Sequence, residues 1–165
     1  PYTSSAASDV YKRQYEHNNE KISSTLIKSF LSEGFVEQAN QALGYEYSIS
    51  GTVIKGDQRG SKIGFPTANL NIDKNIQIPK NGVYKVDVLL NGNLYQGIMN
   101  IGYKPTVSEG IKQSLEVHIF DFNDDVYGAV LTVQFKKFIR DEIKFSSIDE
   151  LTQQISKDIE DINKN

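Results

Sequence analysis

VYKVDVLLNGNLYQGIM, residues 83–99, largely alternates apolar and polar side chains and is divided by an Asn-Gly pair. An apolar side chain at every second position is typical of a β-strand with one buried face. The Asn91-Gly92-Asn93 turn has the composition that tight hairpins favour, because asparagine and glycine accept positive φ angles. The stretch therefore predicts a β-hairpin. The apolar positions of its first strand are Tyr84, Val86, Val88 and Leu90.

The period of two continues on both sides of this hairpin, from Tyr47 to about Ile139. Another strand is predicted where Leu115, Val117 and Ile119 alternate with Glu116, His118 and Phe120. A polar Asn123-Asp124-Asp125 turn then leads into a strand through Val130, Leu131, Val133 and Phe135. Short strands joined by Gly and Asn turns predict a mainly β protein, a small antiparallel Greek-key β-barrel.

Helical patterns flank the predicted barrel. After Ser23, two apolar stripes of helical period end at Gly34 and Gly44, which predicts two short helices. Near the C-terminus, Ser147 and Glu150 have the spacing of a capping box. A stripe at intervals of three and four residues follows, made of Ile148, Leu151, Ile155, Ile159 and Ile162. We therefore expect a C-terminal α-helix that packs on the barrel.

The composition limits the function classes. With 165 residues, the chain has the length of one domain, and its 18 basic and 21 acidic side chains give a net charge of −3. This charge disfavours general nucleic-acid binding. The absence of cysteine excludes disulfides and thiolate metal sites and suits a reducing cytosol. With no long apolar run and no signal-peptide pattern, we expect a cytoplasmic protein without a membrane partner.

The first 20 residues are polar and show no sustained period, which predicts disorder. The segment YTSSAASDVYKRQ, residues 2–14, also resembles translated adapter sequence and is interpreted as a cloning or assembly scar. We therefore exclude this leader from the fold.

A glycine-rich stretch, GTVIKGDQRGSKIGFPTAN, covers residues 51–69. Glycines let a backbone turn its N–H groups toward phosphate oxygens, and Arg59 and Lys62 would add positive charge. The alternative is a hairpin loop with turn glycines. Spacing alone favours that alternative, because the stretch matches neither the P-loop nor the dinucleotide fingerprint.

Three polar residues are candidates for chemistry. Thr67 and Asn69 are two residues apart, so in an extended segment their side-chain oxygens point the same way, as magnesium ligands could. Glu116 lies opposite the apolar face of its strand and could accept a proton. A capped turn and a solvated strand carboxylate are the alternatives, and the residues alone favour them. His118 is interpreted as a hydrogen-bonded structural group.

The stretch GDQRGSKIGFPTANL, residues 56–70, resembles the ATP-binding signature of riboflavin kinases, including its PTAN core. Further segments follow in the order of that family: Gly82-Val83-Tyr84, NIGYKPT at 100–106, LEVHIFDF at 115–122 and FIRDEIKF at 138–145. The resemblance extends from about Tyr47 to Ile162. It implies phosphorylation of the 5′-hydroxyl of riboflavin by ATP and Mg²⁺, which gives FMN and ADP.

The resemblance also assigns residues to roles. It implies a catalytic base at Glu116, magnesium ligands at Thr67 and Asn69, and flavin contacts from Arg140 and Glu142, whose alternative is an exposed loop pair. The residues implied for ATP binding are Gly56, Asp57, Arg59, Gly60, Lys62, Thr67 and Asn69. Two alternatives remain at this point: a noncatalytic flavin-binding barrel and a nucleic-acid-binding barrel.

Upstream, ISSTLIK at residues 22–28 resembles the late ISST motif of the adenylyltransferase half of bacterial bifunctional riboflavin kinase/FAD synthetases, with Lys28 in place of the usual Arg. The early histidine motif of that half is missing, since the histidines are His17 and His118. We therefore expect a leader at 1–20, a helical remnant at 21–44 and a kinase domain at 45–165. We expect a monomeric fragment that makes FMN, whereas the resemblance implies a parent that would also make FAD.

Overall fold

The computed structural model describes residues 16–17, 20–56, 60, 63–106 and 110–164. Its helices are α2 (Ser24–Glu33), α3 (Val36–Leu43) and α4 (Ile148–Lys164). Its longer strands are β3 (Ser48–Ile54), β4 (Ala68–Asn71), β5 (Gly82–Leu90), β6 (Asn93–Thr106), β7 (Gly110–Ile119) and β8 (Val130–Arg140). The short strands β1 (Glu16–His17) and β2 (Glu20–Lys21) form a separate antiparallel ladder, which the sequence pattern did not predict.

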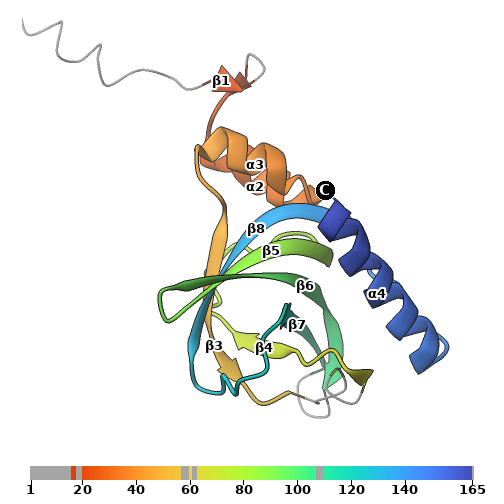
Figure 1. Ribbon diagram of the computed structural model, residues 1–165. Helices are drawn as coiled ribbons and strands as arrows, with labels where there is room; N and C mark the ends of the chain where they lie inside the picture. The colour runs from red at the N-terminus through yellow and green to blue at the C-terminus, as the bar shows by residue number, and fades with distance from the viewer. Residues whose placement is uncertain (1–15, 18–19, 57–59, 61–62, 107–109, 165) are drawn as a thin grey trace, which may run out of the picture.

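The six longer strands form a closed barrel in the order β3-β4-β7-β6-β5-β8, and every neighbouring pair is antiparallel (Figure 1). Strands β5, β6 and β7 follow one another as neighbours, and β8 returns to lie beside β5. This order is that of a Greek key. The predicted mainly β Greek-key barrel is therefore confirmed.

The β5–β6 hairpin has the predicted two-residue turn. Leu90 pairs with Asn93, while Asn91 and Gly92 have φ angles of 50° and 81°. Two consecutive positive φ angles are typical of a type I′ turn, whose twist matches that of the strands. The predicted inner positions of β5 are all buried. Val83, on the opposite face of β5, is also buried, because Ile162 of α4 packs in the same cluster.

Helices α2 and α3 lie at one end of the barrel (Figure 1). Ser23 caps the first helix, and Gly34 and Gly44 end the two helices as predicted. Leu31 and Val36 are buried in the same hydrophobic core as the barrel residue Phe135. The backbone N–H of Lys80, in the segment before β5, donates to the carbonyl of Leu31 at 2.8 Å. The two helices and the barrel therefore share one core.

Helix α4 runs along the outer side of the barrel (Figure 1). Its predicted N-terminal cap is present, since the backbone N–H of Glu150 donates to Ser147 Oγ at 3.2 Å. Ile162 is buried, but Ile148 is 65% exposed, so the predicted apolar stripe is wrong at its first position. Asp158 is only 3% exposed despite its charge. Among the described residues, no helix is both long and apolar enough to cross a membrane.

Candidate active site

The candidate site begins where β4 and β7 pair on the barrel wall. Ala68 pairs with Val117 and Asn69 pairs with Glu116. Ala68 and Val117 are buried in the core, and successive strand residues point to opposite faces. Asn69 and Glu116 therefore project from the outer face. Thr67, directly before β4, contributes its hydroxyl to the same face.

Glu116 is held by three neighbouring side chains. Thr67 Oγ1 donates to its Oε2 at 3.3 Å, and Ser114 Oγ donates to its Oε1 at 3.1 Å. The ammonium nitrogen of Lys104 lies 2.6 Å from the same Oε1. The Glu116 side chain remains 22% exposed. Its carboxylate is therefore fixed in place but still accessible as a proton acceptor.

The described part of the glycine-rich loop approaches the same residues. A side chain at Gly56 would overlap the amide of Asn69, so the backbone of this residue lies directly against Asn69. The carbonyl of Gly60 accepts hydrogen bonds from the N–H groups of Ile63 and Phe65, at 3.1 and 2.9 Å. These contacts bring Gly56 and Gly60 to the outer face of β4. The other implied ATP contacts, Asp57, Arg59 and Lys62, lie outside the described residues.

A cavity of about 300 Å³ opens over this face and brings Thr67 and Glu116 together with Arg140 and Glu142. Gly60 and His118 also line it. Its apolar walls come from the loop after Gly60, from β5 and β6, and from α4 with the segment before it. These wall residues are Ile63, Phe65, Val83, Ile98, Ile143, Phe145, Leu151 and Ile155. The cavity therefore has an apolar side suited to a flat ring and a polar end at Glu116.

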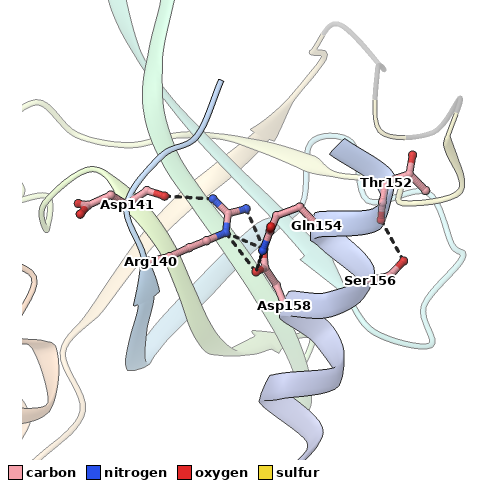
Figure 2. Close-up of polar contacts among 6 residues, drawn as sticks. All are labelled: Arg140, Asp141, Thr152, Gln154, Ser156 and Asp158. Carbon is pink, nitrogen blue, oxygen red and sulfur yellow. Dashed lines mark hydrogen bonds and ion pairs between the residues drawn. The ribbon is translucent and has the colours of Figure 1, made fainter. Parts of the chain in front are cut away.

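Arg140, at the end of β8, reaches across to α4 (Figure 2). Its Nε donates to both carboxylate oxygens of Asp158 at 3.1 and 3.0 Å, and its Nη2 donates to Oδ2 at 2.7 Å. Its Nη1 donates to the carbonyl of Asp141 at 3.0 Å. Gln154 Nε2 also donates to Asp158, at 2.8 Å. Arg140 thus lines the cavity and fastens α4 to the barrel.

Glu142 follows in the segment between β8 and α4. Its carboxylate lies against the backbone of Gly102 on β6, in the space that a side chain there would fill. One residue earlier, Asp141 pairs with Lys80 at 2.7 Å. The structure therefore places Arg140 and Glu142 at one side of the cavity, as parts of a segment tied to the barrel and to α4.

His118 makes the structural contacts that the sequence analysis predicted. Its Nδ1 lies 2.7 Å from the carbonyl of Pro66, and its ring meets Phe65 edge-on at 5.6 Å. These contacts hold the segment before Thr67 against β7. The residue therefore shapes the cavity wall.

A second cavity, also of about 300 Å³, lies on the other side of Thr67. Thr67 and Pro66 form one part of its wall, and the loop from Phe122 to Tyr127 forms another. Asp125 shapes this loop by accepting the N–H of Tyr127 at 2.9 Å. Thr67 thus lies where two cavities meet.

The implied magnesium ion requires oxygen donors at this site. Within the described part of the chain, no group of three or more His, Cys, Asp or Glu could hold a metal. Thr67 and Asn69 instead offer neutral oxygens on one face, close to the carboxylate of Glu116. Mg²⁺ commonly takes few protein ligands and completes its shell with water and phosphate. The residues therefore fit magnesium that arrives with a nucleotide.

Three residues of the site had no role predicted from the sequence: Lys104, Ser114 and Asp158. Ser114 had a local signal, because it precedes Glu116 by two residues in a strand and shares its face. Asp158 also had a local signal in the sequence, since this charged residue interrupts the apolar stripe between Ile155 and Ile162. Lys104 had no local signal, because its contact with Glu116 depends on the pairing of two strands.

Comparisons with known proteins agree with this geometry. A family model described as flavokinase, riboflavin kinase, matches residues 43–165. The chain is 50% identical over 142 residues to a bifunctional riboflavin kinase/FMN adenylyltransferase of Bacillus subtilis, covering 85% of this chain and 45% of that protein. A protein of the same description from Listeria monocytogenes is 44% identical over 143 residues, with 87% and 46% covered.

Similarity extends to solved structures. A crystal structure described as a macrolide-efflux protein from Streptococcus pneumoniae superposes with a TM-score of 0.84 and 38% identity. The match covers 89% of this chain and 48% of that one. This chain thus spans less than half the length of each of these relatives.

Proposed function

The chain belongs to the riboflavin kinase family, and from this premise we propose that it phosphorylates the 5′-hydroxyl of riboflavin with ATP and Mg²⁺. The products are FMN and ADP. The observation that carries the proposal is the meeting of two cavities at Thr67, beside the carboxylate of Glu116. A reaction between two bound substrates needs this arrangement, because the reacting atoms must approach each other at one point.

We assign the cavity between the barrel and α4 to riboflavin. Its apolar walls suit the isoalloxazine ring, and its polar end at Glu116 suits the ribityl chain. Arg140 and Glu142 contribute to flavin binding through the segment that closes one side of this cavity. The cavity beyond Thr67 is assigned to the nucleoside end of ATP.

The phosphate groups of ATP then lie between the two cavities. The described part of the glycine-rich loop lies here, and its backbone at Gly56 and Gly60 approaches Asn69 and Phe65 closely. Asp57, Arg59 and Lys62 are proposed to complete the ATP contacts. Thr67 and Asn69 are the proposed ligands of magnesium, which when bound supplies charge neutralisation on the phosphates.

Glu116 is the proposed proton acceptor. The ribityl oxygen forms a bond to the γ-phosphorus, the bond between that phosphorus and the β,γ-bridging oxygen breaks, and ADP leaves. The hydroxyl proton passes to the Glu116 carboxylate. A carboxylate is too weak a base to ionise an alcohol beforehand, but a loose transition state needs little ionisation of the nucleophile. Positioning and charge therefore supply most of the rate.

The parent protein is a separate part of the proposal. Because the relatives are described as bifunctional, we propose that the parent also adenylylates FMN to FAD. For the 165-residue chain itself we propose FMN as the end product. The described strands are all paired antiparallel, whereas the nucleotidyltransferase half implied by the resemblance needs an α/β sheet. A monomer in the cytoplasm, without membrane or nucleic-acid partners, completes the proposal.

The test is incubation of the purified chain with riboflavin and ATP, with and without Mg²⁺, followed by chromatography of flavins and nucleotides. We expect FMN and ADP in equal amounts, and only with the metal. Binding of riboflavin without FMN formation would instead indicate a noncatalytic flavin-binding barrel. Formation of FAD and pyrophosphate from FMN and ATP would contradict the assignment of FMN as the end product.

A further inference from the structure

Lys104 lies on β6 and lines the cavity assigned to riboflavin. Its ammonium nitrogen is 2.6 Å from Oε1 of Glu116. We propose that Lys104 is a positioning residue, which holds the Glu116 carboxylate in the orientation that accepts the substrate proton. This inference rests on the proposed kinase function. It concerns a residue to which the sequence analysis gave no role.

The strand register shows how far the two side chains must reach. Lys104 is paired with Lys112, whereas Glu116 is paired with Asn100. The two residues are thus four positions apart along the strands, a distance of about 13 Å at roughly 3.3 Å per residue. A 2.6 Å contact requires both side chains to extend along the sheet toward one another. The contact therefore requires a specific, extended conformation of both side chains.

The pair of residues between them leaves room for this contact. Gly102 and Ser114 face each other across β6 and β7, on the same side as Lys104 and Glu116. Glycine has no side chain and serine has a small one. Ser114 also donates to Glu116 Oε1 at 3.1 Å. A side chain at Gly102 would overlap the Glu142 carboxylate, which lies against the backbone here, so Gly102 itself places no side chain between Lys104 and Glu116.

The stability of the fold does not account for the contact. The side chains of Lys104 and Glu116 are 36% and 22% exposed, and ion pairs of this exposure contribute little to folding. Extending a lysine side chain into one conformation also costs rotamer entropy. A role in the site accounts for the arrangement better, because the pair lies in the cavity wall beside Thr67.

The two carboxylate oxygens of Glu116 have different neighbours. Lys104 and Ser114 both contact Oε1, whereas Oε2 faces the hydroxyl of Thr67, where the two cavities meet. Lys104 thus anchors one oxygen and leaves the other directed to the junction. The proton of the ribityl hydroxyl is accordingly received by Oε2.

The test compares Lys104→Met, Lys104→Arg and Lys112→Met in the chain that makes FMN. For Lys104→Met we expect kcat to fall by about 10- to 100-fold, because small misplacements of a reacting group are costly. The KM values for riboflavin and ATP should change by less than about threefold. Lys104→Arg should recover most of kcat. Lys112→Met removes the same charge from an exposed position of β7 and should leave kcat unchanged.

The same substitution in a Glu116→Gln chain distinguishes a Lys104 that positions Glu116 from a Lys104 that acts directly on the substrates. If Lys104 acts through Glu116, then Lys104→Met should lower kcat by less than about twofold in a Glu116→Gln chain. Thermal melting of each variant checks that the fold is retained.

Three results would overturn the inference while leaving the kinase function intact. One is equal kcat for Lys104→Met and the wild-type chain. Another is a loss that is just as large in the Glu116→Gln background. The third is a raised KM for ATP at unchanged kcat, which would make Lys104 a phosphate-binding residue. If the proposed kinase function itself is wrong, the wild-type chain will form no FMN, which is a different result from these three.

Discussion

The two faces of β7 have different surroundings. Val117 is fully buried inside the barrel, where it belongs to the hydrophobic core. Glu116, its neighbour in the chain, lies on the outer face among Thr67, Ser114 and Lys104. Because strand residues alternate between faces, stability and chemistry are separated by one peptide unit. Substitutions at adjacent positions should therefore act mainly on one of the two properties.

The largest effect is expected on the outer face. Glu116→Gln keeps the size of the side chain but removes the proton acceptor, so kcat should fall by about 10²- to 10⁴-fold. KM values and the melting temperature should change little, since the side chain is partly exposed and outside the core. Steady-state kinetics and thermal melting measure the two properties. Undiminished kcat in this variant would make Glu116 a solvated strand residue.

Asn69→Ala should have the next largest effect on kcat. Loss of a proposed magnesium ligand should lower kcat by about 10²- to 10³-fold, because the interaction acts mainly on charge in the transition state. Riboflavin binding, followed by flavin fluorescence, should stay nearly intact. Asn71→Ala is the matched control, since Asn71 lies on the same face of β4 but is exposed and paired with Thr52. Normal turnover of Asn69→Ala at low magnesium would remove this residue from the site.

The inner face was more predictable from the sequence than the outer one. Alternation along β5 and β7 identified the buried residues, because burial depends on a period within one strand. The turn at Asn91-Gly92 and the helix ends at Gly34 and Gly44 were also local signals. The burial of Val83 had no such local signal, because it is due to α4, which follows about 65 residues later in the sequence.

The outer face depends on which strands become neighbours. Thr67, Asn69 and Glu116 were chosen by residue type and resemblance, and the β4–β7 pairing brings them together. Lys104 and Asp158 could not be paired with Glu116 and Arg140 from the sequence, because no local pattern gives strand register or helix docking. Arg140 was expected at the flavin, and the structure adds its contacts with Asp158.

A smaller effect, mainly on stability, is expected on the inner face. Val117→Ala removes two methyl groups from a fully buried position and should lower the free energy of unfolding by about 1.5–3 kcal/mol. Val117 also lines the cavity assigned to the nucleoside end of ATP, so the KM for ATP should rise, whereas the kcat of the folded fraction should stay within about threefold of wild type. Val130→Ala, at a 61% exposed position of β8, is the control and should cost less than about 0.5 kcal/mol. Urea unfolding measures both. A fall in kcat as large as that of Glu116→Gln would contradict the separation of faces.

The smallest effect concerns a polar atom inside the barrel. Tyr84 is fully buried, and its hydroxyl donates to the carbonyl of Lys80 at 2.5 Å. Burial raises the pKa of this hydroxyl above its ordinary value of 10.0, and the charge of Asp141 raises the pKa further. The unfolded chain therefore loses this proton at a lower pH than the folded chain does. The resulting contribution to stability is complete below pH 10 and is lost as the pH rises toward the folded pKa.

Tyr84→Phe removes this titrating group. At pH 7 the variant should lose about 1 kcal/mol of stability with the hydrogen bond, since its ring still fills the core. Between pH 9 and 11 its stability should fall less steeply than that of the wild type. The decline should not vanish, because Tyr47 and Lys136 also have raised pKa values. Burial and the nearby Tyr45 raise the pKa of Tyr47; burial lowers that of Lys136, but contacts with Glu46 and Asp87 outweigh it. Urea unfolding at several pH values gives both slopes, and parallel slopes would show that the interior hydroxyl is not the source of the alkaline sensitivity.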